Sequence, residues 1–202
     1  MPSNPRTRTP SIGMESALVD AASELLEQEG PDALSIRRIA AAAGVAPMGV
    51  YNHFDSKAGI VEALFVAGFG RLGEAMVTLS EIDDPLEALF EGGRRYRALA
   101  LAHPMAYQVM FLQAVRGFEP SDDALATAAR AFDGLVAAVQ RAMRAGVVEA
   151  GDPAMTSQMI WAAIHGWVSL ELCGIGFVED QDAGAELVCT VVMNGLRPAR
   201  PS

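Results

Sequence analysis

The sequence predicts an all-α protein of about nine helices. Three observations predict this class: helix-forming residues dominate the composition, β-branched and aromatic residues do not alternate at the two-residue period of a strand, and helix-start signals recur along the chain. The chain has 202 residues, of which 51% are hydrophobic, so it can bury a core in one domain or in two small ones.

Each expected helix is bounded by its own start and stop signals. Apolar residues recur every three or four positions up to Glu29, and Gly30-Pro31 ends that segment. Ser35 is a suitable N-cap, and Pro47 is suited to the first turn of a short helix. Aspartate, proline and glycine residues separate the later segments. The expected helices cover about residues 14–29, 35–43, 47–54, 57–79, 83–103, 104–117, 120–145, 151–174 and 182–196.

The charge balance excludes a broadly basic nucleic-acid-binding surface. The formal net charge is −10, and Lys57 is the only lysine. Through residue 57 there are five bases and seven acids, a net charge of −2, and the remaining residues carry a net charge of −8. Any binding to DNA must therefore use a few well-placed cations.

The sequence gives no sign of a signal peptide, a membrane span, a disulfide or a metal site. The N-terminal residues have no apolar core of a signal peptide, and no apolar run reaches the ~20 residues of a membrane span, so we expect a cytoplasmic protein with no membrane partner. Cys173 and Cys189 are expected to be buried thiols in a reducing compartment. The three histidines are scattered, so neither a metal site nor a cofactor is expected.

Residues 35–57, SIRRIAAAAGVAPMGVYNHFDSK, have the pattern of a helix-turn-helix. Two short helices are joined by a glycine turn, and another helix precedes them. On the first short helix, Ile36, Ile39, Ala40 and Ala43 should pack inward. Val50 and Phe54 are four residues apart and should share the inward face of the second. This arrangement leaves Met48, Gly49 and Asn52 facing outward, where base edges would lie.

The outward residues have side chains that suit contacts with duplex DNA. Met48 suits a thymine methyl group, Gly49 permits close approach of the backbone, and Arg37 can form two hydrogen bonds to guanine. Tyr51 and His53 can donate to phosphates, and Lys57 stands at a helix N-terminus, which attracts anions.

Other roles remain open for several of these residues. Tyr51 is alternatively a packing residue, and His53 is alternatively a polar surface group. Pro47 and Met48 are alternatively helix-starting residues without base contacts. Arg6 and Arg8 are either solvated charges of a disordered N-terminal arm or contacts to the minor groove.

The sequence resembles the TetR family of repressors from Ala17 to Leu64. The matching residues are Ser-Ile-Arg-Arg-Ile-Ala at 35–40, Ala-Gly-Val at 43–45, Val-Tyr-Asn-His-Phe at 50–54, and Ser56-Lys57 followed by Ile60 and Leu64. The resemblance implies that Arg37, Pro47, Met48 and Gly49 correspond to base-reading positions. It also implies that Tyr51, His53 and Lys57 correspond to phosphate contacts. Pro47-Met48-Gly49 departs from the more polar residues that many relatives carry at these positions.

A second, shorter resemblance covers Trp161 to Leu172, which is similar to the C-terminal domain of a TetR subgroup with a Trp/His-Gly signature. It implies that the helices near 154–174 and 183–196 pair with their copies in a homodimer. Ala162, Ala163, Gly166 and Ser169 are small enough for close helix approach, and the last helix has an apolar stripe of Val188, Val191, Val192 and Leu196. Alternatively, the small residues and the apolar stripe pack within the monomer's own core.

Aromatic residues, methionines and histidines in the C-terminal domain are candidates for a ligand pocket, because pockets are mostly apolar with a few placed polar groups. His165 stands out as a polar group in the most apolar stretch, although it is alternatively an ordinary core histidine. The candidates are Tyr96, His103, Met105 and Trp167, and above all Tyr107, Met110, Phe111, Trp161 and His165.

These observations predict a domain order and a function. We expect a disordered arm over 1–11, a DNA-binding domain over 12–57, a ligand-sensing and dimerisation domain over 58–197, and a tail over 198–202. The expected function is a repressor that binds a palindromic double-stranded DNA operator as a homodimer and responds to an unknown small-molecule effector. The alternatives are a helix-turn-helix protein that acts through protein partners and a helical enzyme, although the sequence offers no catalytic set of residues and we expect no enzyme.

Overall fold

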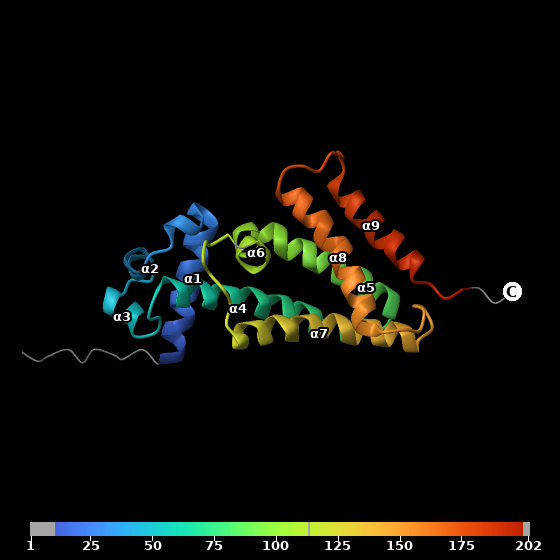
Figure 1. Ribbon diagram of the computed structural model, residues 1–202, viewed down its shortest axis with the longest axis horizontal. Helices are drawn as coiled ribbons and strands as arrows, with labels where there is room; N and C mark the ends of the chain where they lie inside the picture. The colour runs from blue at the N-terminus through green and yellow to red at the C-terminus, as the bar shows by residue number, and fades with distance from the viewer. Residues whose placement is uncertain (1–10, 113, 200–202) are drawn as a thin grey trace, which may run out of the picture. The chain divides into compact units, whose positions relative to one another are not determined.

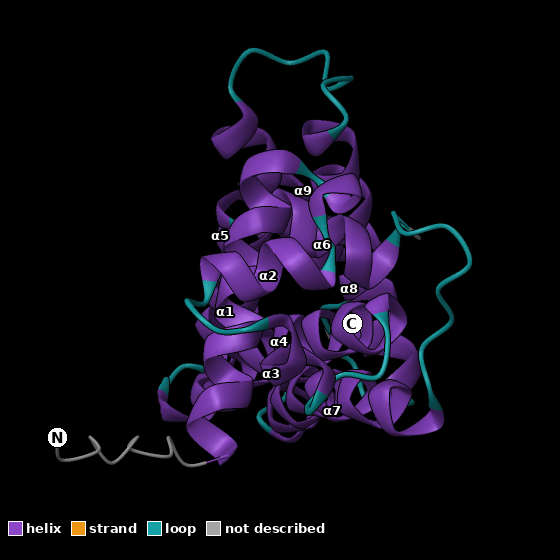
Figure 2. Ribbon diagram, turned by 90° about the vertical axis from the view of Figure 1, so that its left-hand side faces the viewer, coloured by secondary structure: helices purple, strands orange, loops and turns teal. Residues whose placement is uncertain are grey.

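The computed structural model describes residues 11–112 and 114–199, and these residues form α-helices and two short 3-10 helices without any strand (Figures 1 and 2). The all-α class predicted from the sequence is confirmed. The α-helices are α1 (Ser11–Glu29), α2 (Ile36–Ala42), α3 (Pro47–Tyr51), α4 (Lys57–Val77), α5 (Pro85–Ala102), α6 (Pro104–Phe111), α7 (Asp122–Arg144), α8 (Pro153–Leu172) and α9 (Gln181–Gly195).

Several boundaries differ from the expected ones. Helix α1 begins at Ser11, and the rest of the predicted arm lies outside the described residues, as does the end of the predicted tail. Two 3-10 turns, Pro31–Ala33 and Thr78–Glu81, were not expected. Helix α6 ends at Phe111 instead of continuing to residue 117. Gly117 has a φ of +76°, so the backbone there is in a turn that an α-helix does not contain.

The chain folds into two compact units. One contains the residues up to Ala67 together with Met105–Ser121, and the other contains Gly68–Pro104 together with the residues from Asp122 onward. Helix α4 starts in the first unit and ends in the second. The first unit therefore holds α1, α2 and α3, while the second holds α5, α7, α8 and α9.

Aspartate caps fix the start of three helices in the second unit. The side chains of Asp84, Asp152 and Asp180 accept hydrogen bonds from backbone N–H groups in the first turns of α5, α8 and α9. Pro85 and Pro153 follow two of these caps, at positions where the missing N–H group costs nothing. Local sequence signals therefore set these boundaries.

An ion-pair network on α5, α8 and α9 connects the helices of the second unit. The guanidinium of Arg97 on α5 donates to both carboxylate oxygens of Glu171 on α8, at 2.7 and 2.6 Å. It also donates to Asp182 on α9 at 2.6 Å. The Arg97 and Glu171 side chains are only 16% and 14% exposed, so this bidentate contact joins α5 to α8. The bond to the exposed Asp182 links α5 to α9.

The two cysteines are free thiols, and no helix in the described part of the chain is long and apolar enough to cross a membrane. The expectation that both cysteines are buried is wrong. Cys173 is exposed because it follows the last residue of α8, and Cys189 is partly buried.

Candidate nucleic-acid interface and ligand cavity

Helices α2 and α3 form a helix-turn-helix with α1 packed against α2. Ser35 caps α2 by accepting from the backbone N–H of Arg38, and Gly44 adopts a φ of +67° in the turn between the two helices. Ile39, Ala40, Val50 and Phe54 are buried as expected, whereas Ile36 and Ala43 are only partly buried.

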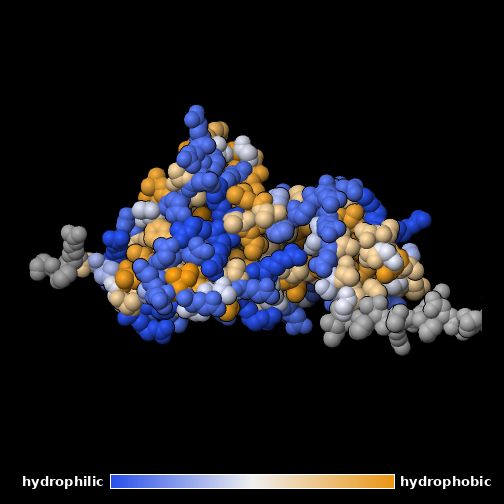
Figure 3. Space-filling model, turned by 180° about the vertical axis from the view of Figure 1, so that it is seen from behind, coloured by the Kyte–Doolittle hydropathy of each residue, from blue (hydrophilic) through white to orange (hydrophobic). Residues whose placement is uncertain are grey.

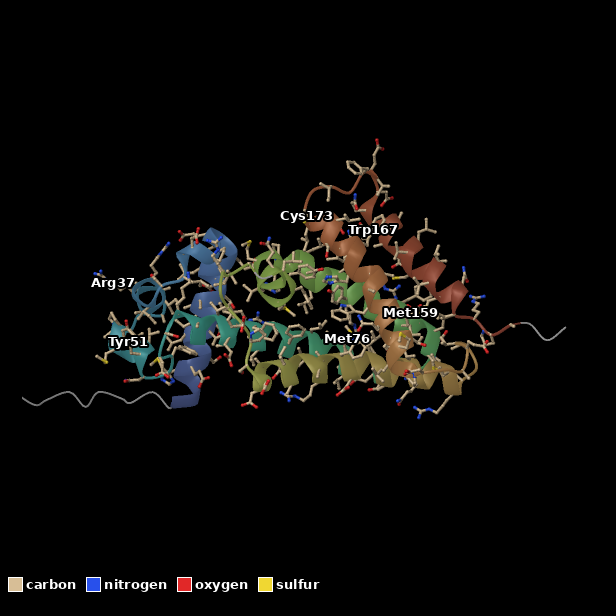
Figure 4. All side chains as sticks on the ribbon, in the orientation of Figure 1. Arg37, Tyr51, Met76, Met159, Trp167 and Cys173 are labelled. Atoms are coloured by element: carbon tan, nitrogen blue, oxygen red, sulfur yellow. The ribbon has the colours of Figure 1, made fainter. Side chains whose placement is uncertain are left out.

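The face of α3 opposite this core is open to solvent. Met48 is 67% exposed and Tyr51 is 50% exposed, and Pro47 and Asn52 are exposed as well. Gly49 is partly buried, because a Cβ atom there would lie 3.6 Å from the side chain of Val45. Met48 and Asn52 therefore face solvent as expected, whereas Gly49 lies partly against Val45 and is less open than expected. Tyr51 projects from the same end of the unit (Figure 4).

The cations beside this face have different environments. Arg37 is exposed and projects from α2 (Figure 4), whereas the adjacent Arg38 forms an ion pair with Glu29 of α1. Lys57 is exposed, and its Nζ donates to the backbone carbonyl of Pro31 at 3.0 Å. That bond holds the Lys57 ammonium at the start of α4, and the group has two further donors for an anion.

His53 is partly buried, and its ring lies 6.5 Å from the ring of Phe54. It immediately precedes this core residue, in the turn after α3. Arg6 and Arg8 lie outside the described residues.

Glu27 has a structural role that the sequence did not reveal. Its carboxylate accepts hydrogen bonds from the backbone N–H groups of Met105 and Ala106, at 3.1 and 2.8 Å. These N–H groups stand at the start of α6, where a negative charge is favoured. The only sequence signal was Pro104, which marks a helix start without indicating which residue satisfies the free N–H groups.

The predicted pocket residues are divided between the two units. Tyr107, Met110 and Phe111 belong to the first, where Tyr107 and Met110 are buried and the rings of Tyr107 and Phe111 lie 5.0 Å apart. Trp161 and His165 belong to the second. The Tyr96 hydroxyl and His165 Nδ1 are hydrogen-bonded at 2.7 Å, and the Trp161 ring meets His165 edge-on at 5.7 Å.

The second unit contains a small apolar cavity of about 50 Å³. This volume is below the roughly 300–1,000 Å³ of ligand pockets, so a ligand requires the lining side chains to move apart. Trp161 is the only one of the five favoured pocket residues, all of which the structure describes, that lines it, and His165 reaches it through Tyr96. The lining residues are Phe69, Leu72 and Met76 from α4, Tyr96 from α5, Ala128, Ala131, Phe132 and Leu135 from α7, and Trp161 from α8.

Sequence reasoning missed the contributions of α4 and α7 to this cavity. The α7 residues were detectable, because positions 128, 131, 132 and 135 follow the three-and-four spacing of one helix face.

Burial lowers the pKa of His165, so the imidazole beside Tyr96 favours its neutral form.

Helices α8 and α9 carry large apolar side chains that no described part of their unit covers. Met155, Met159 and Leu170 of α8 and Leu187 and Val191 of α9 are about half exposed or more. Hydrophobic side chains are visible on this region in the view from behind (Figure 3). A groove of about 540 Å³ lies between Trp167 and the exposed face of α9. The buried Nε1 atom of Trp167 has no hydrogen-bond partner among the described residues.

Comparisons with known proteins agree with this architecture. Residues 18–64 match the family model described as bacterial regulatory proteins, tetR family, and residues 89–192, just over half of the chain, match a tetracyclin repressor-like C-terminal domain. An uncharacterized HTH-type transcriptional regulator of Mycobacterium tuberculosis, Rv0681, is 27% identical over 182 residues, which cover 87% of this chain and 78% of that protein.

Solved structures share the fold at low sequence identity. A protein of unknown function from Rhodococcus sp. RHA1 has a TM-score of 0.82 at 24% identity and covers 97% of this chain and 100% of its own. The TetR-family regulator PfmR from Thermus thermophilus has a TM-score of 0.66 at 21% identity, with 90% and 99% covered. Family and fold thus point to a transcriptional regulator rather than an enzyme. The chain belongs to the TetR family of DNA-binding transcriptional regulators.

Proposed function

We propose that the chain is a ligand-controlled repressor that binds a near-palindromic operator as a homodimer. The observation that carries this proposal is the exposed face of α3, which presents Met48, Tyr51 and Asn52 while Val50 and Phe54 anchor the helix in the core. A helix held in this way can enter the major groove without losing its own packing.

The proposed contacts divide into base contacts and phosphate contacts. Arg37, Pro47, Met48, Gly49 and Asn52 face base edges. Among them, Arg37 suits guanine, Asn52 suits adenine and Met48 suits a thymine methyl group. The phosphate contacts come from three further residues that can donate hydrogen bonds, and these are Tyr51, His53 and Lys57.

Two features support the proposed homodimer, the small size of α3 and the uncovered apolar face of α8 and α9. A five-residue recognition helix reads few base pairs, whereas two copies related by a two-fold axis read two half-sites about 34 Å apart. The exposed side chains of Met155, Met159, Leu187 and Val191 form an apolar surface of the kind that is buried in homodimers.

The cavity supports ligand control. It is built partly from Phe69, Leu72 and Met76 of α4, the same helix that begins at Lys57. A ligand that binds more tightly to one arrangement of α4 shifts the spacing of the two recognition helices, and operator affinity falls by a coupling free energy of about 1–3 kcal/mol.

Selection of bound sequences from a random duplex pool, followed by fluorescence anisotropy over a range of salt concentrations, tests DNA recognition. We expect a palindromic consensus and a steep fall of log affinity with log salt. Lys57→Ala should weaken binding to every sequence and reduce the salt slope by about one. Lys57→Gln keeps a donor for the Pro31 carbonyl without the charge and should show the same loss.

An unchanged slope in both variants would remove Lys57 from the phosphate contacts. A protein that binds no duplex at low ionic strength would overturn the whole proposal. A reporter gene placed behind the selected site tests the direction of control, and transcription that rises when the protein is present would show an activator in place of a repressor.

A further inference from the structure

The cavity of the second unit has a chemical character that restricts its ligand. None of its nine lining residues is charged. The hydrogen-bonding groups among the lining side chains are the Tyr96 hydroxyl and the Trp161 indole N–H, and the other contacts are aliphatic, aromatic or thioether groups. The cavity therefore offers large apolar contact area and little polar contact.

In the part of the chain that the structure describes, no charged group on the lining helices is itself part of the cavity lining. Arg95, which precedes Tyr96, donates to Glu91, to the Thr78 hydroxyl and to the Ala75 carbonyl. Asp133, which follows Phe132, is exposed and is not part of the lining.

His165 does not supply a charge either. It is hydrogen-bonded to Tyr96 at 2.7 Å, and burial lowers its pKa, so it is a neutral partner at neutral pH. An anionic head group inside this cavity would thus lack the cation that a buried carboxylate or phosphate needs.

A cationic ligand is the competing possibility, because Phe69, Tyr96, Phe132 and Trp161 are aromatic. Attraction between a cation and an aromatic face offsets only part of the free energy needed to remove the cation from water. No carboxylate among the described residues lines the cavity to offset the remainder.

We infer that the ligand of this cavity is a small neutral molecule, mostly aromatic or aliphatic, that hydrogen-bonds through one polar group near Tyr96. This inference rests on the proposed function, because it specifies the ligand of the same regulator. The α7 residues Ala128, Phe132 and Leu135, which line the cavity, are only partly buried.

Three probes with one ring system test the inference: 2-naphthol, 2-naphthoate and 2-naphthylmethylammonium. Their affinities for the full chain are measured by isothermal titration calorimetry without DNA. We expect 2-naphthol to bind about 100-fold more tightly than either charged probe. Failure of 2-naphthol to bind, or equal binding of a charged probe, would overturn the inference.

Two alanines on α7 provide a matched pair of variants. Ala128 lines the cavity, whereas Ala129 is exposed. Ala128→Met fills the space and should weaken 2-naphthol binding at least about tenfold, while Ala129→Met should leave it within about twofold. Unchanged circular dichroism and cooperative urea unfolding show that both variants fold. Equal affinity of the two variants would place the probe elsewhere and contradict the inference.

Operator release separates the two proposals. If 2-naphthol binds in the cavity but leaves operator affinity unchanged, ligand control is wrong and the class of ligand stands. If a charged probe releases the operator and Ala128→Met blocks that effect, ligand control stands and the neutral class is wrong.

Discussion

Arg37 and Arg38 are neighbours in the sequence, yet only Arg38 is engaged within the described part of the protein. Arg38 pairs with Glu29, and both side chains of that pair are nearly half exposed, at 45% and 46%. An exposed pair of this kind contributes only about 0–1 kcal/mol to stability. Arg37 projects from the same turn of α2 toward solvent. Arg37 and Arg38 therefore allow a proposed DNA contact to be compared with a structural contact.

Replacement of Arg37 by alanine should reduce discrimination at one base pair of the operator by about 1–3 kcal/mol, because a bidentate contact to guanine is lost. Arg38→Ala is the matched control and should leave base preference unchanged. Anisotropy with operator variants substituted one position at a time measures both. A uniform loss over all sequences in Arg37→Ala would make Arg37 a backbone contact.

His165 makes a prediction about pH. Burial lowers its pKa below the ordinary value of 6.5 in the folded chain, so below about pH 6.5 the unfolded chain binds a proton that the folded chain does not. The free energy of unfolding should therefore fall as the pH is lowered from 6.5 toward the folded-state pKa. Urea unfolding at pH 7.5 and 5.5 measures this fall, which should be smaller in His165→Gln. Equal falls would show that His165 titrates alike in both states.

At the scale of elements, Gly134 of α7 lies close to Met76 of α4. A Cβ atom at Gly134 would lie 2.8 Å from the Cβ of Met76, which is a clash with a buried side chain that also lines the cavity. At Gly73 a Cβ atom would lie 3.5 Å from the backbone of Ala131, which is ordinary contact. The missing side chain at position 134 thus sets the distance between these helices.

Gly134→Ala should lower the free energy of unfolding by about 1–3 kcal/mol, since the helices must shift or Met76 must repack. Gly70→Ala is the control within α4, because a Cβ atom there meets nothing within 4 Å. That change should raise stability by roughly 0.5–1 kcal/mol through helix propensity. Urea unfolding of both variants tests the pair, and a stabilised Gly134→Ala would show that the close approach carries no strain.

At the scale of the whole molecule, the exposed apolar face of α8 and α9 is the surface through which we propose that the chain dimerises. Val191 of α9 is 62% exposed and lies on this face, and Val77 at the end of α4 is similarly exposed at 64% but lies outside it. If the chain dimerises through α8 and α9, an aspartate at position 191 places a charge inside the interface, where it is desolvated without a partner.

Val191→Asp should shift the protein to a monomer in sedimentation velocity experiments and lower operator affinity, while circular dichroism remains that of a folded helical protein. Val77→Asp should leave the sedimentation coefficient unchanged. A dimeric Val191→Asp with wild-type operator affinity would place the interface elsewhere.

The sequence alone determined the features that depend on neighbours along the chain. Asp84 and Asp152, each followed by proline, marked the starts of α5 and α8, and the spacing of Val50 and Phe54 predicted which face of α3 is buried. These signals act through a hydrogen bond or one helical turn, so a few adjacent residues carry the information.

Only the tertiary structure decided which distant residues meet. The Lys57 contact with the Pro31 carbonyl spans 26 residues, Glu27 caps a helix that starts 77 residues later, and the cavity combines four helices. No local pattern encodes such pairings, because each depends on how whole helices pack. The same reason explains why Trp161 was predicted as a pocket residue while Met76, which also lines the cavity, was not.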